Sequence, residues 1–214
     1  MNSAWQSSEL PAGVTHRILL VRHGETAHSA RGLCYGKLDV DLSPTGFKQA
    51  AQTAQLIKPF KPQAIYSSPR LRALDTAAAI TNACGLDVIV DDNLAELDFG
   101  DFEGLSYEEA ERQYPDLYQQ WMAHPTNIQF PNGESYAQMS SRVINFTSQL
   151  ISRHTGQTIV TVAHGGVNRI VLAKTLGLKS EWIFRLEQSY GAINCIDYYG
   201  DTPVLRTMNW ISAN

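Results

Sequence analysis

The sequence predicts an α/β protein, a three-layer α/β/α sandwich around a mostly parallel mixed sheet. Short apolar runs typical of buried strands alternate along the chain with helical patterns. The chain has 214 residues, of which 43% are hydrophobic, and this composition suits a single well-buried domain. Strands that alternate with helices are typical of a sheet covered by helices on both faces.

The first half of the chain predicts three strands and two helices. Ser43 is a good helix N-cap and Pro44 is tolerated at the first helical position, so a helix is expected to begin there. Pro69 opens a second helix in the same way, and Gly85 suits the residue that ends it. The predicted strands are 17–21, 64–66 and 88–90, and the predicted helices are 43–57 and 69–85.

The second half contains two capping boxes, in which a serine and a side chain three residues later each satisfy a backbone N–H. They are Ser106 with Glu109 and Ser135 with Gln138, and Pro115 predicts a further helix start between them. After Ser135 an apolar stripe recurs at helical spacing, formed by Tyr136, Met139, Val143, Phe146 and Leu150. The remaining predicted elements are strands 158–162, 193–198 and 204–208 and a helix over 167–176.

Charge and composition argue against several classes of protein. The formal net charge is −4, from 17 basic and 21 acidic residues, so a general nucleic-acid or anionic-membrane binder is not expected. No run approaches the ~20 apolar residues that span a bilayer, and the start of the chain lacks signal-peptide features, so a cytoplasmic location is expected. Residues 1–14 are expected to form a flexible leader and residues 15–214 a single domain. Three cysteines without C-x-x-C spacing predict reduced thiols.

Polar residues follow the predicted strands at the point where each strand ends. They are Arg22, His23 and Gly24 after the first strand, residues 67–70 after the second, Glu96 shortly past the third, and His164, Gly165 and Gly166 after the fourth. Ligands bind at the carboxyl ends of the strands in sheets of this kind. We therefore expect these residues to converge on one active site.

His23 is the predicted nucleophile. A neutral histidine has a free ring-nitrogen lone pair, and attack on phosphorus requires the other nitrogen to be held as a donor, for which we expect a backbone carbonyl. Arg22 and Arg70 can each offer two parallel donors to phosphate oxygens. Gly24 allows the backbone to approach a bound oxyanion, because glycine has no Cβ.

Glu96 and the segment after the fourth strand complete the expected chemistry. Glu96 is the candidate to protonate the leaving alkoxide and then to deprotonate the attacking water. A protonated His164 would donate to phosphate, and the amides of Gly165 and Gly166 lie at a positive helix end. His23, His164 and Glu96 could instead bind a metal, but two nearby arginines would oppose a cation and the chain has no H-x-x-x-H pair. Neither a metal nor a cofactor is expected.

The motifs at the strand ends are long and occur in a characteristic order. They are Leu20-Val21-Arg22-His23-Gly24-Glu25-Thr26, Leu42-Ser43-Pro44-x-Gly46, Ser67-Ser68-Pro69-Arg70, Glu96-Leu97-x-Phe99-Gly100-x-Phe102-Glu103-Gly104 and Ala163-His164-Gly165-Gly166. Over about residues 16–166 the chain thus resembles the histidine phosphatase superfamily, the phosphoglycerate-mutase-like proteins. The resemblance implies that fold, a phosphohistidine at His23, and Glu96 as proton donor and acceptor. It also implies a phosphate pocket formed by Arg22, Arg70 and His164.

One position departs from the family pattern. The family often has asparagine six residues after the nucleophile, where this chain has Ser29. A serine hydroxyl can still donate to phosphate with shorter reach, so Ser29 is kept as a candidate binding residue.

The resemblance leaves the substrate open, because the superfamily contains phosphatases, mutases and proteins that only bind. A mutase that handles a bisphosphorylated intermediate needs a second anion site. Residues 97–141 contain one arginine, Arg112, no lysine and many acids. This composition favours a substrate with one phosphate and a larger neutral remainder.

Finer features resemble the alpha-ribazole phosphatases of cobalamin nucleotide-loop assembly. They are Leu33-Cys34-Tyr35-Gly36-x-x-Asp39-Val40-x-Leu42, Phe130-Pro131-Asn132-Gly133-Glu134-Ser135 and Gln188-Ser189-Tyr190-Gly191-Ala192-Ile193-Asn194. Tyr35 and Gly36 are therefore candidate substrate-binding residues, and the Tyr35 ring could stack on a base or ribose or simply pack within its loop. Trp121, Phe130 and Tyr136 are predicted to be core residues rather than ligand contacts.

The sequence therefore predicts a phosphomonoesterase whose partner is a small phosphorylated molecule, either nucleotide-like or a sugar phosphate. An alpha-ribazole 5'-phosphate phosphatase is the first hypothesis, and a broad-specificity or sugar-phosphate phosphatase is the second. A phosphoglycerate mutase and a non-catalytic phospholigand-binding module are the remaining alternatives. The sequence does not distinguish a monomer from a homodimer.

Overall fold

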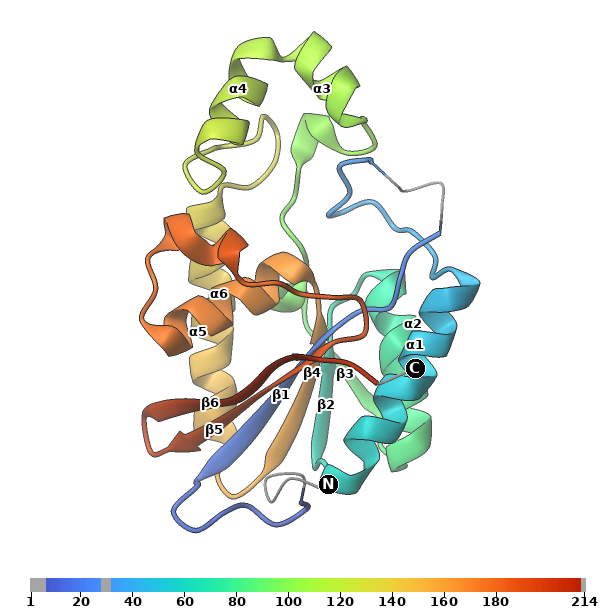
Figure 1. The fold of residues 1–214 in the computed structure, drawn as a ribbon, viewed down its shortest axis with the longest axis vertical. Helices are drawn as coiled ribbons and strands as arrows, with labels where there is room; N and C mark the ends of the chain where they lie inside the picture. Colours follow the sequence, from blue (N-terminus) through green and yellow to red (C-terminus); the bar gives the residue numbers. More distant parts are fainter. Residues whose placement is uncertain (1–6, 28–31, 213–214) are drawn as a thin grey trace.

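The computed structural model describes residues 7–27 and 32–212, and at its centre lies a mixed sheet of six strands (Figure 1). The strands are β1 (His16–Arg22), β2 (Ala64–Ser67), β3 (Val88–Val90), β4 (Thr158–Ala163), β5 (Ile193–Tyr199) and β6 (Thr202–Trp210). Their order is β3-β2-β4-β1-β5-β6. Strands β1 to β4 pair in parallel, whereas β5 and β6 are antiparallel to their neighbours. The predicted mostly parallel mixed sheet is confirmed.

Helices cover both faces of this sheet. The helices are α1 (Pro44–Ile57), α2 (Leu71–Cys84), α3 (Tyr107–Gln113), α4 (Pro115–Ala123), α5 (Tyr136–Arg153) and α6 (Gly165–Leu176). Figure 1 shows α1 and α2 on one side of the sheet and α5 and α6 on the other. Helices α3 and α4 lie beyond the end of the sheet, in the excursion between β3 and α5. The predicted three-layer α/β/α sandwich is confirmed.

Strand β1 is buried on both faces, because it lies in the sheet interior between β4 and β5. Ile18 and Leu20 belong to the hydrophobic cluster that contains residues of α5 and α6, and Leu19 and Val21 belong to the cluster with α1 and α2. Successive side chains of a strand point to opposite faces, so one continuous apolar run fills both layers. This packing places the next polar residue, His23, at the carboxyl end of the central strands.

The predicted helix caps are present. The Ser43 side chain accepts a hydrogen bond from the Gly46 amide (3.0 Å), and both capping boxes form, at Ser106 and at Ser135. Of the predicted stripe on α5, the buried members are Met139, Val143, Phe146 and Leu150, and Tyr136 is half-buried. Helix α5 therefore packs on the sheet through the face that its spacing predicts.

Two helix starts differ from the prediction. Helix α2 begins at Leu71 rather than at Pro69, because the Ser68 amide continues the pairing of β2 with β4 by donating to the Val162 carbonyl (2.9 Å). Helix α6 begins at Gly165, two residues earlier than predicted. Both differences concern the segments that leave the carboxyl ends of strands, where local sequence signals compete with the sheet.

The excursion between β3 and α5 has a hydrophobic cluster of its own. Its buried members are Cys34, Phe102, Ala110, Trp121, Ile128 and Phe130. Phe130 is fully buried, as predicted for a core residue. In Figure 1 the excursion lies beyond the carboxyl ends of β1, β2 and β4, so it overhangs the edge of the sheet at which the polar residues gather.

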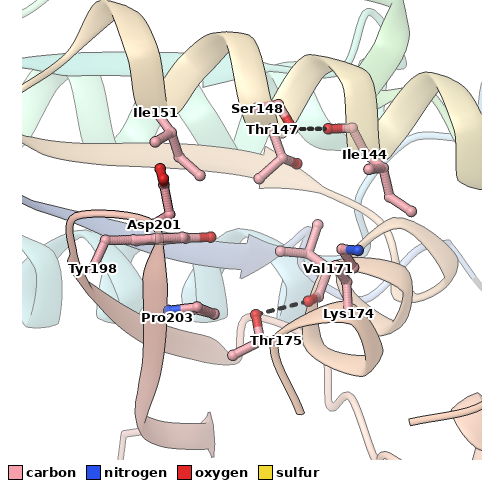
Figure 2. Close-up of a pocket in the computed structure, with 10 residues that line it drawn as sticks. All are labelled: Ile144, Thr147, Ser148, Ile151, Val171, Lys174, Thr175, Tyr198, Asp201 and Pro203. Carbon is pink, nitrogen blue, oxygen red and sulfur yellow. Dashed lines mark hydrogen bonds between the residues drawn. The ribbon is translucent and has the colours of Figure 1, made fainter. Parts of the chain in front are cut away.

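A cavity of about 340 Å³ lies on the opposite part of the molecule, between α5, α6 and the β5–β6 hairpin (Figure 2). Tyr198 extends into it, and burial raises the pKa of Tyr198 to about 12. None of its lining residues follows the carboxyl end of a parallel strand. The cavity is therefore separate from the predicted site.

Within residues 7–27 and 32–212, no helix combines the length and the apolar composition that a membrane span requires.

Candidate active site

His23 lies directly after β1, is buried, and has its ring oriented by the next residue. Its Nδ1 lies 2.7 Å from the carbonyl oxygen of Gly24. A carbonyl can only accept a hydrogen bond, so Nδ1 carries the hydrogen and Nε2 keeps its lone pair. The expected backbone carbonyl is confirmed, and it leaves His23 in the tautomer that a nucleophile needs.

The surroundings of His23 keep its ring uncharged. Burial, followed by the positive charges of Arg72 and Arg22, lowers the pKa of His23 well below its usual value of 6.5. The hydrogen bond to Gly24 acts in the opposite direction and has a smaller effect. His23 is therefore in its neutral, nucleophilic form at neutral pH.

His164 follows β4 and lies edge-on to His23, with 5.1 Å between the ring centroids. Its Nδ1 accepts a hydrogen bond from Nε of Arg72 (3.3 Å), so Nε2 carries the hydrogen and donates to the Ser68 hydroxyl (2.7 Å). Burial and then Arg72 lower the pKa of His164 well below 6.5. His164 is therefore neutral in this structure, and both of its ring nitrogens are engaged by side chains of the protein.

The arginine that contacts His164 is Arg72, which the sequence analysis did not single out; it named Arg70, two residues earlier, as an arginine of the phosphate pocket. Arg72 lies in the first turn of α2 and is fully buried. Its two terminal nitrogens donate to the carbonyl oxygens of Leu38 (2.9 Å) and Gly36 (2.8 Å). Arg72 is therefore held in place by the loop before α1 and acts directly on the two histidines.

Arg70 is half-buried just before α2, and its Nε is buried without a hydrogen-bond partner in the described residues. It lines a polar cavity of about 470 Å³ together with Glu96. A contact in the structure separates the two arginines. Thr76 lies one helical turn after Arg72, and its hydroxyl accepts a hydrogen bond from the Gly24 amide (3.0 Å), so that face of α2 is the one turned to the site.

Arg22 is placed where the sequence predicts. One terminal nitrogen donates to the carbonyl of Gln188, and the guanidinium carbon lies 3.9 Å from the centroid of the Tyr190 ring. Its Nε is buried and has no hydrogen-bond partner among the described residues. A buried N–H without a partner is unfavourable, and a bound oxyanion would satisfy it. Arg22 thus has a donor that an anion in the site could use.

Glu96 follows β3 and is held by two backbone amides. Its Oε2 accepts from Gly166 (3.0 Å) and its Oε1 accepts from Leu97 (3.0 Å). A Cβ at Gly166 would overlap the Glu96 carboxylate, so this close approach requires glycine. The Gly166 amide, expected to serve a phosphate, holds Glu96 instead.

The remaining glycines of the predicted site, Gly24 and Gly165, lie where a Cβ would come too close to neighbouring groups. A Cβ at Gly24 would overlap the backbone of Gly46, and a Cβ at Gly165 would lie 2.8 Å from a terminal nitrogen of Arg169 and 3.6 Å from Nε of Arg22. Two guanidinium groups therefore converge beside Gly165 at the start of α6. Ser29, which the sequence analysis named as a candidate binding residue, lies outside the described residues.

Glu103 holds the loop that contains Gly36, a predicted substrate-binding residue. Its carboxylate accepts hydrogen bonds of 2.8 to 3.1 Å from the backbone amides of Gly36, Lys37, Leu38 and Phe99. The carbonyls of Gly36 and Leu38 are the groups that accept from Arg72. Gly36 therefore supports Arg72, and Glu103 is a positioning residue that the sequence analysis quoted only as part of a motif.

Replacing Glu103 with alanine is expected to lower the free energy of unfolding by about 1–3 kcal/mol, because amides of the loop lose their acceptor. The same change should raise KM, since the loop that orients Arg72 is loosened. Urea unfolding and steady-state kinetics measure the two effects. Glu108→Ala, which removes an exposed carboxylate of the same excursion, is the control. Unchanged stability and KM in Glu103→Ala would contradict this role.

The two buried histidines of the site, His23 and His164, make stability depend on pH. Because their folded pKa values lie below 6.5, the unfolded chain binds more protons, and stability present at neutral pH is lost as the pH falls from 6.5 through the folded pKa values. The expected slope is up to about 1.4 kcal/mol per pH unit for each histidine. Urea unfolding between pH 5 and 8 tests this. His164→Asn should flatten the dependence, whereas the same change at the exposed His124 should not.

A cavity of about 490 Å³ adjoins Glu96 and Gly166. Most of its lining is apolar or aromatic, from Leu97, Phe99, Tyr107, Trp121, Met122, Pro125, Tyr136, Met139, Ile183 and Phe184. Trp121 and Tyr136, predicted as core residues, thus also present surface to this cavity. Arg169 is the one basic residue among the described residues that line it.

The sequence also left open a metal site formed by His23, His164 and Glu96. In the described part of the chain, no group of three or more histidine, cysteine, aspartate or glutamate side chains is placed to hold a metal ion. The guanidinium of Arg72 occupies the position next to His164 instead.

Comparisons with known proteins agree with this geometry. The family model of the histidine phosphatase superfamily (branch 1) matches residues 18–211. Phosphoserine phosphatase 1 of Hydrogenobacter thermophilus is 36% identical over 83% of this chain and 86% of its own length. The metal-independent phosphoserine phosphatase of Arabidopsis thaliana is 31% identical over 91% of this chain and 78% of its own length.

A solved structure shares the arrangement of the whole chain. The alpha-ribazole phosphatase from Shigella flexneri superposes with a TM-score of 0.84 at 28% identity, over 92% of this chain and 99% of that one. The family model covers most of the chain, including the strand ends that carry His23, Glu96 and His164. This chain therefore belongs to the histidine phosphatase superfamily.

Proposed function

We propose that this protein is a phosphomonoesterase that works through a phosphohistidine at His23. In the first step the Nε2 lone pair attacks phosphorus, and the P–N bond forms as the ester P–O bond breaks. The carboxylic acid of Glu96 gives its proton to the leaving alkoxide. In the second step the Glu96 carboxylate takes a proton from water, whose oxygen attacks the phosphohistidine. Inorganic phosphate leaves, and both residues return to their starting forms.

The observation that carries this proposal is the tautomer of His23. Its Nδ1 donates to Gly24 at 2.7 Å, and its pKa is lowered by burial and by two arginines, so Nε2 is unprotonated at neutral pH. The unpartnered Nε of Arg22 is available to the negative charge that develops on the phosphoryl oxygens. Glu96 is held at the start of α6 by the Gly166 amide, between two cavities that can take the leaving group.

For the substrate we propose alpha-ribazole 5'-phosphate, as in cobalamin nucleotide-loop assembly. The cavity beside Glu96 is lined by Phe99, Trp121 and Tyr136, and aromatic side chains favour stacking on a flat base. The likeness to the alpha-ribazole phosphatase of Shigella flexneri supports the same choice. A neutral nucleoside also suits the scarcity of basic residues in the excursion.

Arg169 favours a second candidate, a phosphomonoester whose alcohol carries a carboxylate. Its Nε donates to the Leu186 carbonyl (2.9 Å), whereas its terminal nitrogens have no hydrogen-bond partner in the described residues. These nitrogens lie across Gly165 from Arg22, at the boundary between the phosphate site and the aromatic cavity. A guanidinium edge matches a carboxylate, and the two curated relatives described above are named phosphoserine phosphatases.

A substrate comparison separates these candidates. The values of kcat/KM are measured for alpha-ribazole 5'-phosphate, phosphoserine, phosphoethanolamine and simple sugar phosphates. A preference of more than about tenfold for the nucleotide supports the first candidate. A preference for phosphoserine over phosphoethanolamine, which differ by one carboxylate, supports the second. Equal values for all four compounds would indicate a broad-specificity phosphatase.

Arg169→Gln sharpens the comparison. If Arg169 binds a substrate carboxylate, the variant loses activity toward phosphoserine but not toward phosphoethanolamine. If it binds the phosphoryl group, the variant loses activity toward both compounds equally. Arg185→Gln is a matched control, because Arg185 is exposed and stacks on Trp182 away from the cavity.

A further inference from the structure

Two tyrosines lie against the two arginines nearest His23. The guanidinium carbon of Arg22 lies 3.9 Å from the centroid of the Tyr190 ring, and that of Arg72 lies 5.1 Å from the centroid of the Tyr35 ring. The Tyr190 ring is also 5.6 Å from the ring of His23. Each arginine of the pocket thus has an aromatic face beside it.

The two tyrosines also contact each other through their hydroxyl groups. The Tyr35 hydroxyl lies 3.3 Å from that of Tyr190 and 3.0 Å from the hydroxyl of Thr26. Burial raises the pKa of Tyr35 to about 12, so its hydroxyl keeps its hydrogen and can donate across the working range of pH. The loop that contains Thr26 and Tyr35 is therefore joined, beside the nucleophile, to Tyr190, which is distant in the chain.

This arrangement matches what a phosphate-binding arginine requires. A guanidinium binds oxyanions through the N–H groups at its edge, and an aromatic ring supports its flat face without using any of those groups. Among the described residues the Nε of Arg22 is a buried donor without a partner, and Tyr190 covers the face of the same guanidinium. The stacked ring also limits the rotamers that this long side chain would otherwise sample.

We propose that Tyr190 is a positioning residue whose ring holds Arg22 in the orientation that binds the phosphoryl group. The hydroxyl contact with Tyr35 is a second, smaller support for the same ring. This inference rests on the proposed phosphatase function. Its test therefore includes anion binding, which can be measured without turnover.

The variants separate the ring from the hydroxyl. Tyr190→Leu removes the aromatic face and is expected to weaken binding of vanadate and inorganic phosphate roughly 2- to 30-fold, the range of one cation–π contact. Tyr190→Met retains apolar volume and gives the same test if the leucine variant does not fold. Tyr190→Phe keeps the ring and should lose less than about threefold. Titration calorimetry and steady-state kinetics on the full chain provide the binding constants, KM and kcat.

Tyr199→Leu is the matched control. It removes a tyrosine that also stacks on an arginine, Arg206, but at the β5–β6 hairpin. Anion binding should be unchanged in this variant. If Tyr199→Leu weakens anion binding as much as Tyr190→Leu, the effect is a general loss of stability and the proposal is overturned.

Other outcomes are equally decisive. A Tyr190→Phe variant as impaired as Tyr190→Leu would show that the hydroxyl itself acts on the substrate, and a lower melting temperature with unchanged anion binding would show a structural role only. Either result overturns the inference. If the wild-type protein binds vanadate but shows neither turnover nor a trapped phosphoenzyme, the proposed function is contradicted. The positioning of the arginine can still be tested in that case by anion binding.

Discussion

Replacing His23 with alanine is expected to lower kcat by at least about 10⁴-fold with every phosphomonoester tested, because no other group in the site can take the phosphoryl group. The neutral imidazole, with Nδ1 bound to the Gly24 carbonyl, is the nucleophile that both steps of the proposed reaction share. Quenching wild-type protein with alkaline detergent during turnover of a ³²P-labelled substrate should trap a phosphoprotein whose label is stable to base and lost in acid. The same treatment of His23→Ala should trap none.

Two controls accompany the His23→Ala experiment. His124→Ala changes an exposed histidine of the excursion and should leave both kcat and labelling unchanged. Dialysis against EDTA should leave the wild-type activity unchanged, because the proposed steps use only side chains of the chain and water. Labelling that persists in His23→Ala, or activity lost to chelation, would count against the phosphohistidine mechanism.

Replacing Glu96 with glutamine is expected to lower kcat for an alkyl phosphate by roughly 10²- to 10⁴-fold, the usual contribution of a general acid-base group. Both steps of the proposed reaction need a proton moved at the Glu96 carboxyl. Glutamine keeps the size of the side chain, and its amide oxygen can still accept from Gly166, so the geometry at the start of α6 is retained.

The leaving group distinguishes the two tasks of Glu96. p-Nitrophenolate leaves without a proton, so Glu96→Gln should form the phosphoenzyme quickly from p-nitrophenyl phosphate and hydrolyse it slowly. Rapid-mixing experiments should then show a burst of nitrophenolate and accumulation of phosphohistidine. If Glu96→Gln lowers the rate of phosphoenzyme formation by the same factor with p-nitrophenyl phosphate as with an alkyl phosphate, Glu96 is not the acid of the first step. Glu108→Gln is the matched control.

The fold was predictable because its signals are local or periodic. The apolar run of β1 is long enough to fill both layers, and capping boxes at Ser106 and Ser135 mark helix starts that the structure reproduces. The start of α2 was placed wrongly, because the proline signal at Pro69 is local, whereas the pairing of Ser68 with Val162 is made by the sheet.

The site was only partly predictable for the same reason. Motif position indicated His23, Glu96 and His164, and the structure places them together. The choice between Arg70 and Arg72 depends on which side of the start of α2 faces β4. The sequence does not reveal this side, because the two arginines are only two residues apart. The engagement of the Gly166 amide by Glu96 joins segments far apart in the chain, so no local pattern contains it.

The parallel pairing of β1 with β4 also has a consequence for how the protein reaches its active state. Arg22 pairs with Ala163, so the segment that contains His23 meets the segment that contains His164 only after most of the chain has been synthesised. Contacts between distant segments require closure of long loops, which slows folding. A partly folded chain in which the β5–β6 hairpin and the helices have formed but β4 has not yet inserted would have secondary structure without a phosphate pocket. Recovery of phosphatase activity after dilution from denaturant therefore reports whether β4 has paired with β1.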